Sequence, residues 1–328
     1  MLTRRLLLAG AAAPLALPAW AAPEDFRAFL SGVRTEARRA GISSVTLDRA
    51  FAGLQPNPRV VELDRKQPEF VLTWEQYRTR VISDQRIADG KIAWRQNAPL
   101  LQAIHTSYGV DPRVIIGIWG LESNFGTKTG GFHVIEALAT LAWEGRRAAF
   151  FRGELIAALK ILEHGDISVA SMTGSYAGAM GQPQFMPSSY VRLAVDFDGD
   201  GRRDIWSSRA DALGSIGNYL QKSGWRDGES WGQEILLPAG FSGETGRDHR
   251  RPLGEWLRQG IKPVGEKPLA RAETTAAIIL PDGPRDGPRD GAAGAAFFAY
   301  GNFGAIRRYN PSDFYALAVG LIGDQVAA

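Results

Sequence analysis

A run of apolar residues that ends in a single acidic group constrains the fold of this chain most. Asp111-Pro112 is a strong helix start, because Asp can cap free amide groups and Pro fits the first helical position. Residues 114–121 are apolar or glycine on nearly every side, so the helix must be buried. The sequence therefore predicts a central buried helix with the carboxylate of Glu122 at its C-terminal end.

This position gives Glu122 the properties of a general acid. Burial disfavours the charged carboxylate, and so does the negative end of the helix dipole, so both raise its pKa. A group that donates a proton near neutral pH needs such a raised pKa. The residues alone leave one alternative open, in which Glu122 pairs with a buried Arg and only stabilises the fold.

A second segment, residues 174–190, combines small residues with hydrogen-bonding side chains. It contains Ser175, Gln184 and several aromatic residues among five Gly and Ala positions between 174 and 181. Hydroxyl and amide groups can bind the hydroxyl and acetamido groups of sugars, and aromatic rings can cover the apolar faces of pyranose rings. Tight packing under a loop explains the same residues equally well.

A third segment matches the calcium loop of an EF-hand. Carboxylates stand at positions 1, 3, 5 and 9, with Gly at position 6: Asp196, Asp198, Asp200, Asp204 and Gly201. Position 12 is Ser207 instead of Glu, so Asp211 would have to close a longer loop. We expect a structural Ca²⁺ ion here; a solvated acidic turn is the alternative.

The first 22 residues have the pattern of a signal peptide. Arg4 and Arg5 precede an apolar run over 6–13, and the segment ends in Ala19-Trp20-Ala21, a small-x-small cleavage site. The run is too short to span a membrane and is followed by Pro14 and Pro18. We expect export to the periplasm, and the pattern leaves the Sec and twin-arginine routes both open.

Composition excludes several classes of function. The chain has no Cys, so we expect no disulfide, no thiol catalysis and no lipid-modified cysteine as a membrane anchor. Removal of the leader, with Arg4 and Arg5, lowers the formal net charge from +3 to +1. A net charge this close to zero gives no indication of a basic face that could bind nucleic acid, so no nucleic-acid partner is predicted.

The pattern along the chain predicts a mainly α (α+β) protein. Residues 23–107 read as a helical domain, interrupted by a mixed-charge loop at Glu62–Phe70. Residues 108–228 form the predicted core with the acidic loop, and residues 229–328 a small β-containing region. The last region contains two β-prone runs, Glu234–Leu237 and Thr274–Leu280, a turn-rich repeat at Gly283–Gly291 and a final helix that packs on the core.

With these motifs in this order, the chain resembles the lytic murein transglycosylase B family (glycoside hydrolase family 103). The resemblance rests on Glu122–Gly126, Gly174–Tyr190, Glu62–Phe70, the acidic loop, Asn218-Tyr219 and Arg308–Ser312. It implies a lysozyme-like catalytic core. It also implies a lytic enzyme that cleaves the β-1,4 bond between N-acetylmuramic acid and N-acetylglucosamine in peptidoglycan and leaves 1,6-anhydromuramyl ends.

In that reaction Glu122 would act as the single acid and base, and no catalytic cofactor would be needed. The partners that the resemblance implies are the glycan strands of peptidoglycan, with other cell-wall enzymes as further candidates. The resemblance implies sugar- or peptide-binding roles for Ser175, Gln184, Tyr219, Tyr309, Asn310, Tyr315, Arg146 and Arg147. It implies calcium ligands at Asp196, Asp198, Asp200, Asp211 and the Arg202 carbonyl. Two alternatives remain: a lysozyme-type hydrolase with Glu136 or Glu144 as second carboxylate, and a non-catalytic wall-binding protein.

Overall fold

The computed structural model describes residues 23–66, 72–265, 267–283 and 294–328. The predicted signal peptide (1–22) lies outside the described residues, as do 67–70 of the predicted Glu62–Phe70 loop and 284–291 of the turn-rich repeat. In the part that is described, no helix combines the length and the apolar character needed to cross a membrane.

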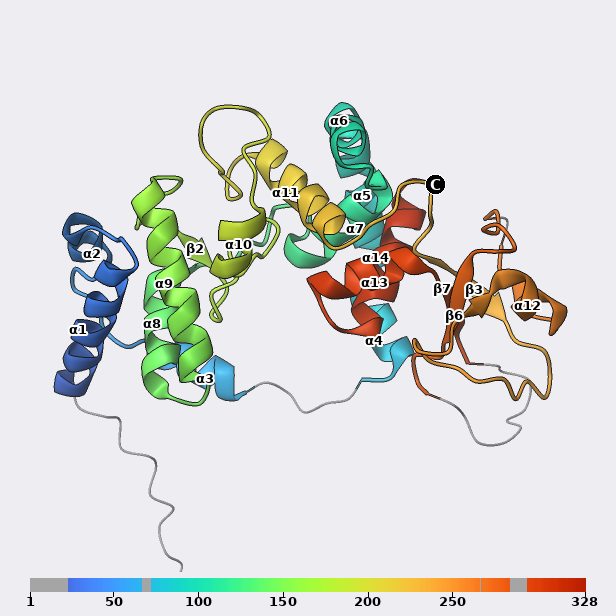
Figure 1. Ribbon diagram of the computed structural model, residues 1–328, viewed down its shortest axis with the longest axis horizontal. Coiled ribbons are helices and arrows are strands. Elements are labelled where there is room, and N and C mark those ends of the chain that lie inside the picture. The colour runs from blue at the N-terminus through green and yellow to red at the C-terminus, as the bar shows by residue number, and fades with distance from the viewer. Residues whose placement is uncertain (1–22, 67–71, 266, 284–293) are drawn as a thin grey trace, which may run out of the picture.

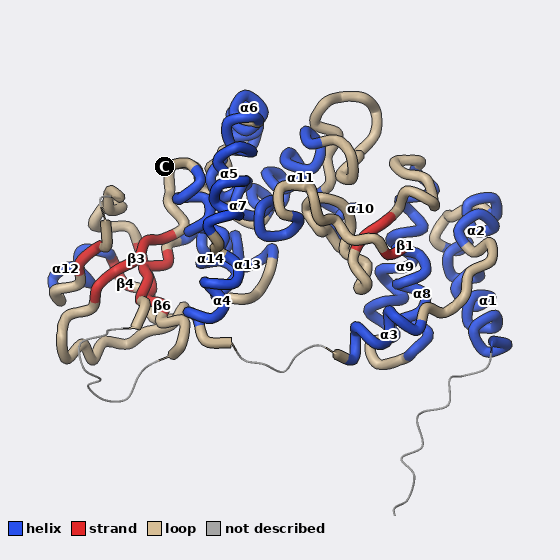
Figure 2. The backbone as a smooth tube through the Cα atoms, turned by 180° about the vertical axis from the view of Figure 1, so that it is seen from behind, coloured by secondary structure: helices blue, strands red, loops and turns tan. Residues whose placement is uncertain are grey.

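Helices dominate the described residues, and the strands are short (Figures 1 and 2). The helices are α1 (Pro23–Arg39), α2 (Ser44–Ala50), α3 (Pro58–Arg65), α4 (Trp74–Val81), α5 (Asp84–Gln96), α6 (Ala98–Tyr108), α7 (Pro112–Ser123), α8 (Val134–Glu144), α9 (Ala148–His164), α10 (Pro187–Leu193), α11 (Arg209–Lys222), α12 (Leu253–Arg258), α13 (Gly301–Tyr309) and α14 (Asp313–Val326). The strands are β1 (Phe132–His133), β2 (Thr173–Gly174), β3 (Gly232–Leu236), β4 (Arg251–Pro252), β5 (Lys262–Pro263), β6 (Thr275–Ile279) and β7 (Ala296–Ala299).

The predicted central helix is confirmed as α7. The side chain of Asp111 accepts a hydrogen bond from the amide of Arg113 at 2.9 Å, and Pro112 takes the first helical position. Every residue from Val114 to Gly120 is buried, so the helix is covered on all sides. An apolar circumference is stable only in such a position.

The prediction of a loop at Glu62–Phe70 is wrong for its first part, because Glu62–Arg65 forms the last turn of α3. The helix starts upstream, where the side chain of Asn57 accepts from the amide of Arg59 at 2.9 Å and Pro58 follows. The start signal thus lies outside the mixed-charge run that suggested a loop.

Five of the strands form one antiparallel sheet in the order β4-β6-β7-β3-β5. Strands β3 and β6 fall on the two predicted β-prone runs, and β7 pairs with both of them. Leu253 and Trp256 of α12 pack on buried residues of the sheet, which lies at one end of the molecule (Figure 1). The short pair β1–β2 lies apart from this sheet, beside α9 and α10 (Figure 2).

Two large buried clusters divide the remaining helices, and each takes side chains from both sides of residue 107. One cluster joins α1–α3 to α8 and α9, for example through Phe26, Val60 and Leu138. The other joins α4–α7 to α11, α13 and α14. In Figure 1 the first cluster lies at the end opposite the sheet. The predicted domain limits at 107 and 228 stay a prediction.

Helix α14 packs along α7 at backbone distance. A Cβ added to Gly117 of α7 would lie 2.3 Å from the carbonyl oxygen of Val319, and one added to Gly323 of α14 would lie 2.2 Å from that of Arg113. Glycine at these places removes the side chain that would hold the helices apart. The helix that carries Glu122 is therefore fixed by direct contact with the C-terminal helix.

We expect Gly117→Ala to lower the free energy of unfolding by about 2–3 kcal/mol, because the new methyl group must push α14 away from α7. The matched control is Gly153→Ala in α9, where nothing lies within 4 Å of the added Cβ. That change should stabilise the helix by about 0.5–1 kcal/mol. Urea unfolding of both variants measures the difference. Equal stability of the two variants would contradict the close α7–α14 packing.

Candidate active site

Glu122 occupies the last turn of α7, directly before a left-handed turn. Asn124 and Phe125 have positive φ values of 48° and 57°, which reverse the chain at the end of the helix. The ring of Phe125 folds back over α7, where a Cβ on Gly120 would lie only 2.6 Å from it. The turn after Glu122 is thus packed against the helix that carries it.

The carboxyl group of Glu122 is bound to Tyr315 near the start of α14. The Tyr315 hydroxyl donates to Glu122 Oε1 at 2.6 Å, and the Ser312 hydroxyl caps α14 by accepting from the Tyr315 amide at 3.3 Å. Burial raises the pKa of Glu122 to about 7, although the hydrogen bond from Tyr315 opposes this shift. A carboxyl group with such a pKa is populated in both protonation states near neutral pH.

The three predicted tyrosines form a row of neighbouring rings that begins at Tyr315, the partner of Glu122. The rings of Tyr309 and Tyr315 stack with centroids 6.5 Å apart, and those of Tyr219 and Tyr309 lie 4.6 Å apart. The Tyr309 hydroxyl donates to the carbonyl of Pro183, and that of Tyr219 to the carbonyl of Arg308. These rings form an aromatic wall that links α11, α13 and α14 to residues 174–185.

Asn310 has a structural partner in the turn between α13 and α14. Its side-chain oxygen accepts from the amide of Ser312 at 3.2 Å. The residue thus orders the turn that leads from Tyr309 to Tyr315.

One residue of this site carries no signal in the sequence. Tyr77 of α4 is half-buried, and its ring lies 5.5 Å from that of Phe314. Burial raises the pKa of the Tyr77 hydroxyl, and the negative charge of Glu122 raises it further. Tyr77 therefore belongs to the surroundings of Glu122. It comes from a charged, surface-like stretch whose composition gives no reason to place it here.

Residues 174–185 pack against the loop that follows Glu122. A Cβ on Gly130 would lie 2.2 Å from the carbonyl oxygen of Gly174 and 2.8 Å from the amide of Ser175. The side-chain nitrogen of Gln184 donates to the carbonyls of Thr129 at 3.0 Å and Gly181 at 2.8 Å. The Ser175 hydroxyl accepts from the amides of Ala177 and Ala179. Ser175 and Gln184 thus order the loops beside Glu122, and their hydrogen bonds found here do not reach Glu122 itself.

Arg146 and Arg147 form ion pairs with one buried acid, Asp64 of α3. Arg147 Nη2 lies 3.0 Å from Asp64 Oδ1, and Arg146 also donates to the Asp64 carbonyl at 3.0 Å. The two arginine side chains remain 48% and 43% exposed, so each keeps a face toward solvent. Their first partner is therefore structural: they tie α3 to the turn between α8 and α9.

The two acids considered as a second carboxylate have partners elsewhere. Glu144 lies 2.7 Å from Arg65, and its hydrogen bonds to Arg65 and to the Arg146 amide lower its pKa despite partial burial. Glu136 accepts from the side chain of Asn57. Neither acid contributes to the shifted pKa of Glu122, whose causes are burial and Tyr315.

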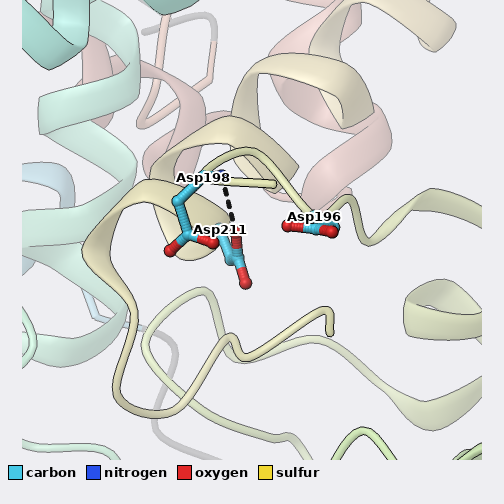
Figure 3. Close-up of side chains that lie close together, drawn as sticks. All are labelled: Asp196, Asp198 and Asp211. Carbon is cyan, nitrogen blue, oxygen red and sulfur yellow. Dashed lines mark hydrogen bonds between the residues drawn. The ribbon is translucent and has the colours of Figure 1, made fainter. Parts of the chain in front are cut away.

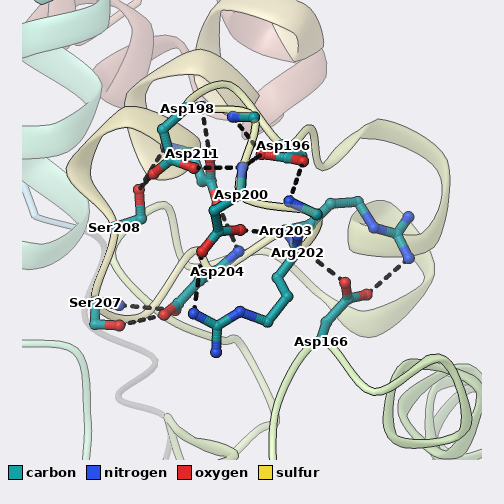
Figure 4. A network of polar contacts seen from close by, with 12 residues as sticks. Asp166, Asp196, Asp198, Asp200, Arg202, Arg203, Asp204, Ser207, Ser208 and Asp211 are labelled. Atoms are coloured by element: carbon teal, nitrogen blue, oxygen red, sulfur yellow. Dashed lines mark hydrogen bonds and ion pairs between the residues drawn. The ribbon is translucent and has the colours of Figure 1, made fainter.

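The acidic loop brings three of its carboxylates together. Oxygen atoms of Asp196, Asp198 and Asp211 lie within 4.8 Å of one another (Figure 3). Asp211 is fully buried, and burial raises its pKa. Asp200 lies outside this group and pairs with the side chain of Arg202 at 3.0 Å (Figure 4).

The chemistry of this donor set fits a hard divalent cation. All its ligand atoms are carboxylate oxygens, which Ca²⁺ prefers. Both oxygens of the buried Asp211 accept from backbone amides, and a bound cation would add a positive charge beside this carboxylate. The longer closure predicted through Asp211 is thus compatible with the geometry, while Asp200 would have to release Arg202 in order to join.

A comparison with known proteins gives the family. The model of the transglycosylase SLT domain matches residues 25–324. Membrane-bound lytic murein transglycosylase B of Escherichia coli K12 is 35% identical over 260 residues, which cover 77% of this chain and 67% of that protein.

Solved structures agree with the family match. The crystal structure of SltB3 from Pseudomonas aeruginosa in complex with NAG-anhNAM-pentapeptide is 46% identical, with a TM-score of 0.85 over 92% of this chain and 80% of that one. The Escherichia coli lytic transglycosylase Slt35 in complex with calcium is 30% identical, with a TM-score of 0.75 over 92% of each chain. The predicted mainly α fold with a lysozyme-like core is confirmed by these matches. This chain belongs to the SLT-domain lytic transglycosylases.

Proposed function

We propose that this protein cleaves the β-1,4 bond between N-acetylmuramic acid and N-acetylglucosamine in peptidoglycan, with Glu122 as its only catalytic acid and base. The observation that carries the proposal is the half-buried carboxyl group of Glu122, with a pKa of about 7 and a hydrogen bond to Tyr315. The bound sugar in the SltB3 structure is an anhydro sugar, the kind of product this reaction forms.

The reaction consumes no water and needs one carboxyl group. Protonated Glu122 gives its proton to the glycosidic oxygen, and the bond from that oxygen to C1 of the muramyl residue breaks. The carboxylate then takes the proton from the C6 hydroxyl of the same residue, whose oxygen bonds to C1. Since nucleophile and electrophile belong to one sugar, the attack is intramolecular. A hydrolase would instead need a second carboxylate, and Glu136 and Glu144 are engaged elsewhere.

The other predicted residues are assigned to substrate binding in the same proposal. The aromatic wall of Tyr219, Tyr309 and Tyr315 would cover sugar faces beside Glu122. Ser175, Gln184 and Asn310 would shape the adjoining loops. The solvent-facing sides of Arg146 and Arg147 would meet the carboxylates of the stem peptide, a group that Arg is suited to bind. With the predicted signal peptide, the proposed place of action is the periplasm.

We expect the parental protein to release anhydromuropeptides from purified sacculi, and Glu122→Gln to release about a thousandfold less, since Gln cannot transfer a proton. Mass spectrometry of the soluble fraction distinguishes the products by the mass of one water. Hydrated reducing ends would favour a lysozyme-type hydrolase, and a parental protein without any release would favour a wall-binding protein. Undiminished release by Glu122→Gln would refute the role of Glu122.

The raised pKa of Glu122 also predicts a pH-dependent stability. Between an ordinary pKa of 4.5 and its value of about 7, the folded protein holds a proton that the unfolded chain has lost. The contribution of Glu122 to stability therefore falls as the pH rises through this window. Gln keeps an acceptor for Tyr315 but carries no charge.

We accordingly expect Glu122→Gln to be more stable than the parental protein at pH 8, by on the order of 2 kcal/mol, and the difference to vanish near pH 4. Urea unfolding at both pH values measures it. Glu273→Gln, at an exposed glutamate, serves as the control and should match the parental protein at both. A Glu122→Gln variant with the parental stability at pH 8 would contradict the shift.

We further propose that Asp196, Asp198 and Asp211 hold a structural Ca²⁺ ion, with Asp200 and the Arg202 carbonyl as additional ligands. The three clustered carboxylates support this, and so does the relative Slt35, whose structure was solved in complex with calcium. The ion would neutralise the buried Asp211 and stabilise the loop before α11.

We expect millimolar Ca²⁺ to raise the melting temperature of metal-stripped protein by about 3–8 °C, because a ligand that binds only the folded state stabilises it. Asp196→Ala should abolish this shift, whereas the control Asp248→Ala, at an exposed acid outside the loop, should keep it. Differential scanning calorimetry with and without chelator is the measurement. If Ca²⁺ leaves the melting temperature of the parental protein unchanged, the proposed calcium site is excluded.

A further inference from the structure

Gln182 lies between the helix that carries Glu122 and the exit of the acidic loop. The residue is 5% exposed, and every polar atom of its side chain has a partner. Its side-chain oxygen accepts from Trp119 Nε1 at 2.9 Å, and its side-chain nitrogen donates to the Trp206 carbonyl at 3.1 Å. Its backbone amide donates to the carbonyl of Ile205 at 2.9 Å.

Trp119, the hydrogen-bond partner of Gln182 on α7, lies one turn before Glu122. The ring of Trp119 meets that of Phe125 edge to face, with centroids 5.8 Å apart. Phe125 belongs to the left-handed turn that follows Glu122. In the same turn, a Cβ on Gly126 would lie 2.6 Å from Oε1 of Gln182. The side-chain oxygen of Gln182 thus contacts α7 at Trp119 and the turn after Glu122 at Gly126.

Trp206, whose carbonyl accepts from the Gln182 side chain, is itself fixed by hydrogen bonds. Trp206 Nε1 donates to the carbonyl of Thr173 in β2 at 2.8 Å, and the Trp206 amide donates to Asp204 at 3.0 Å. Asp204 is linked through its amide to the buried Asp211 at 2.7 Å (Figure 4). Gln182 is therefore linked through Trp206 to β2 and to the acidic loop.

We infer that Gln182 is a positioning residue for Glu122: it holds Trp119 and the turn at Gly126 against the support formed by Ile205 and Trp206. An amide is suited to this place because it accepts on one side and donates on the other. Gln182 does not touch the reacting atoms. It acts by keeping the end of α7 and the following turn in one arrangement, with Glu122 shielded from water. This inference rests on the proposed catalytic role of Glu122.

The test is Gln182→Met, which keeps the length of the side chain and removes its two side-chain hydrogen bonds, to Trp119 and Trp206. The matched control is Gln233→Met, at a buried glutamine of β3 that donates to the Lys267 carbonyl at 2.9 Å. With a soluble peptidoglycan tetrasaccharide, we expect kcat of Gln182→Met to fall about ten- to a hundredfold while KM changes less than about twofold. Gln233→Met should keep the parental values.

A second readout separates positioning from general loss of stability. When the turn loosens, water reaches Glu122 and its pKa falls toward the ordinary value, so the alkaline limb of the kcat profile should move to lower pH in Gln182→Met. Trp119→Phe keeps an aromatic ring at this position and removes the donor, so it should shift the limb in the same direction. The two changes together should have less than the sum of their separate effects on log kcat.

The outcomes are distinct. If the parental protein releases no anhydromuropeptides, the proposed function fails. If the parental protein is active and Gln182→Met has the kcat and pH profile of Gln233→Met, the positioning role is overturned. Should Gln182→Met not fold, Trp119→Phe decides alone: an unshifted alkaline limb with parental kcat overturns the inference.

Discussion

The close packing of α7 against α14 is the contact on which the rest of this structure depends. Gly117 and Gly323 allow the two backbones to meet, and this places Tyr315 within hydrogen-bonding distance of Glu122. The carboxyl group and its partner come from residues 193 positions apart. A side chain at Gly117 would push α14 away from α7 and so disturb that hydrogen bond, since packed interiors accommodate added volume poorly.

The surroundings of Glu122 combine two opposing influences. Burial favours the neutral acid, whereas the Tyr315 hydroxyl favours the carboxylate, and the balance leaves the pKa near 7. A deeper site without Tyr315 would hold a permanently neutral acid, and an exposed one a permanent carboxylate. The role proposed for Glu122, in which it first donates a proton and then recovers one, needs this intermediate condition. The aromatic wall supplies the burial and the hydroxyl group together.

Much of the fold and of the site could be predicted from the sequence where a local pattern carries the information. The cap at Asp111, the apolar run of α7 and the position of Glu122 follow from propensity and periodicity. Tyr77 could not be found in this way, because its place depends on how α4 packs against residues more than 200 positions later. The ion pairs of Asp64 with Arg146 and Arg147 were also out of reach, since a long-range pair leaves no trace in local spacing. For the same reason, local patterns could not predict that the first helices separate into two clusters.

That separation has a consequence for how the protein reaches its native state. Residues 26–60 share their cluster with residues 134–205, and residues 74–119 share theirs with residues 213–326. The amino-terminal segment therefore has no complete core until the middle of the chain is present, and the central segment waits for the carboxyl terminus. Such interleaving places contacting residues far apart in the sequence, which slows folding because long loops must close before those contacts form. The cluster around α1–α3 is complete in sequence at residue 205, whereas the cluster that contains α7 forms only once residues 213–326 are present, so the environment of Glu122 is the later of the two to be assembled.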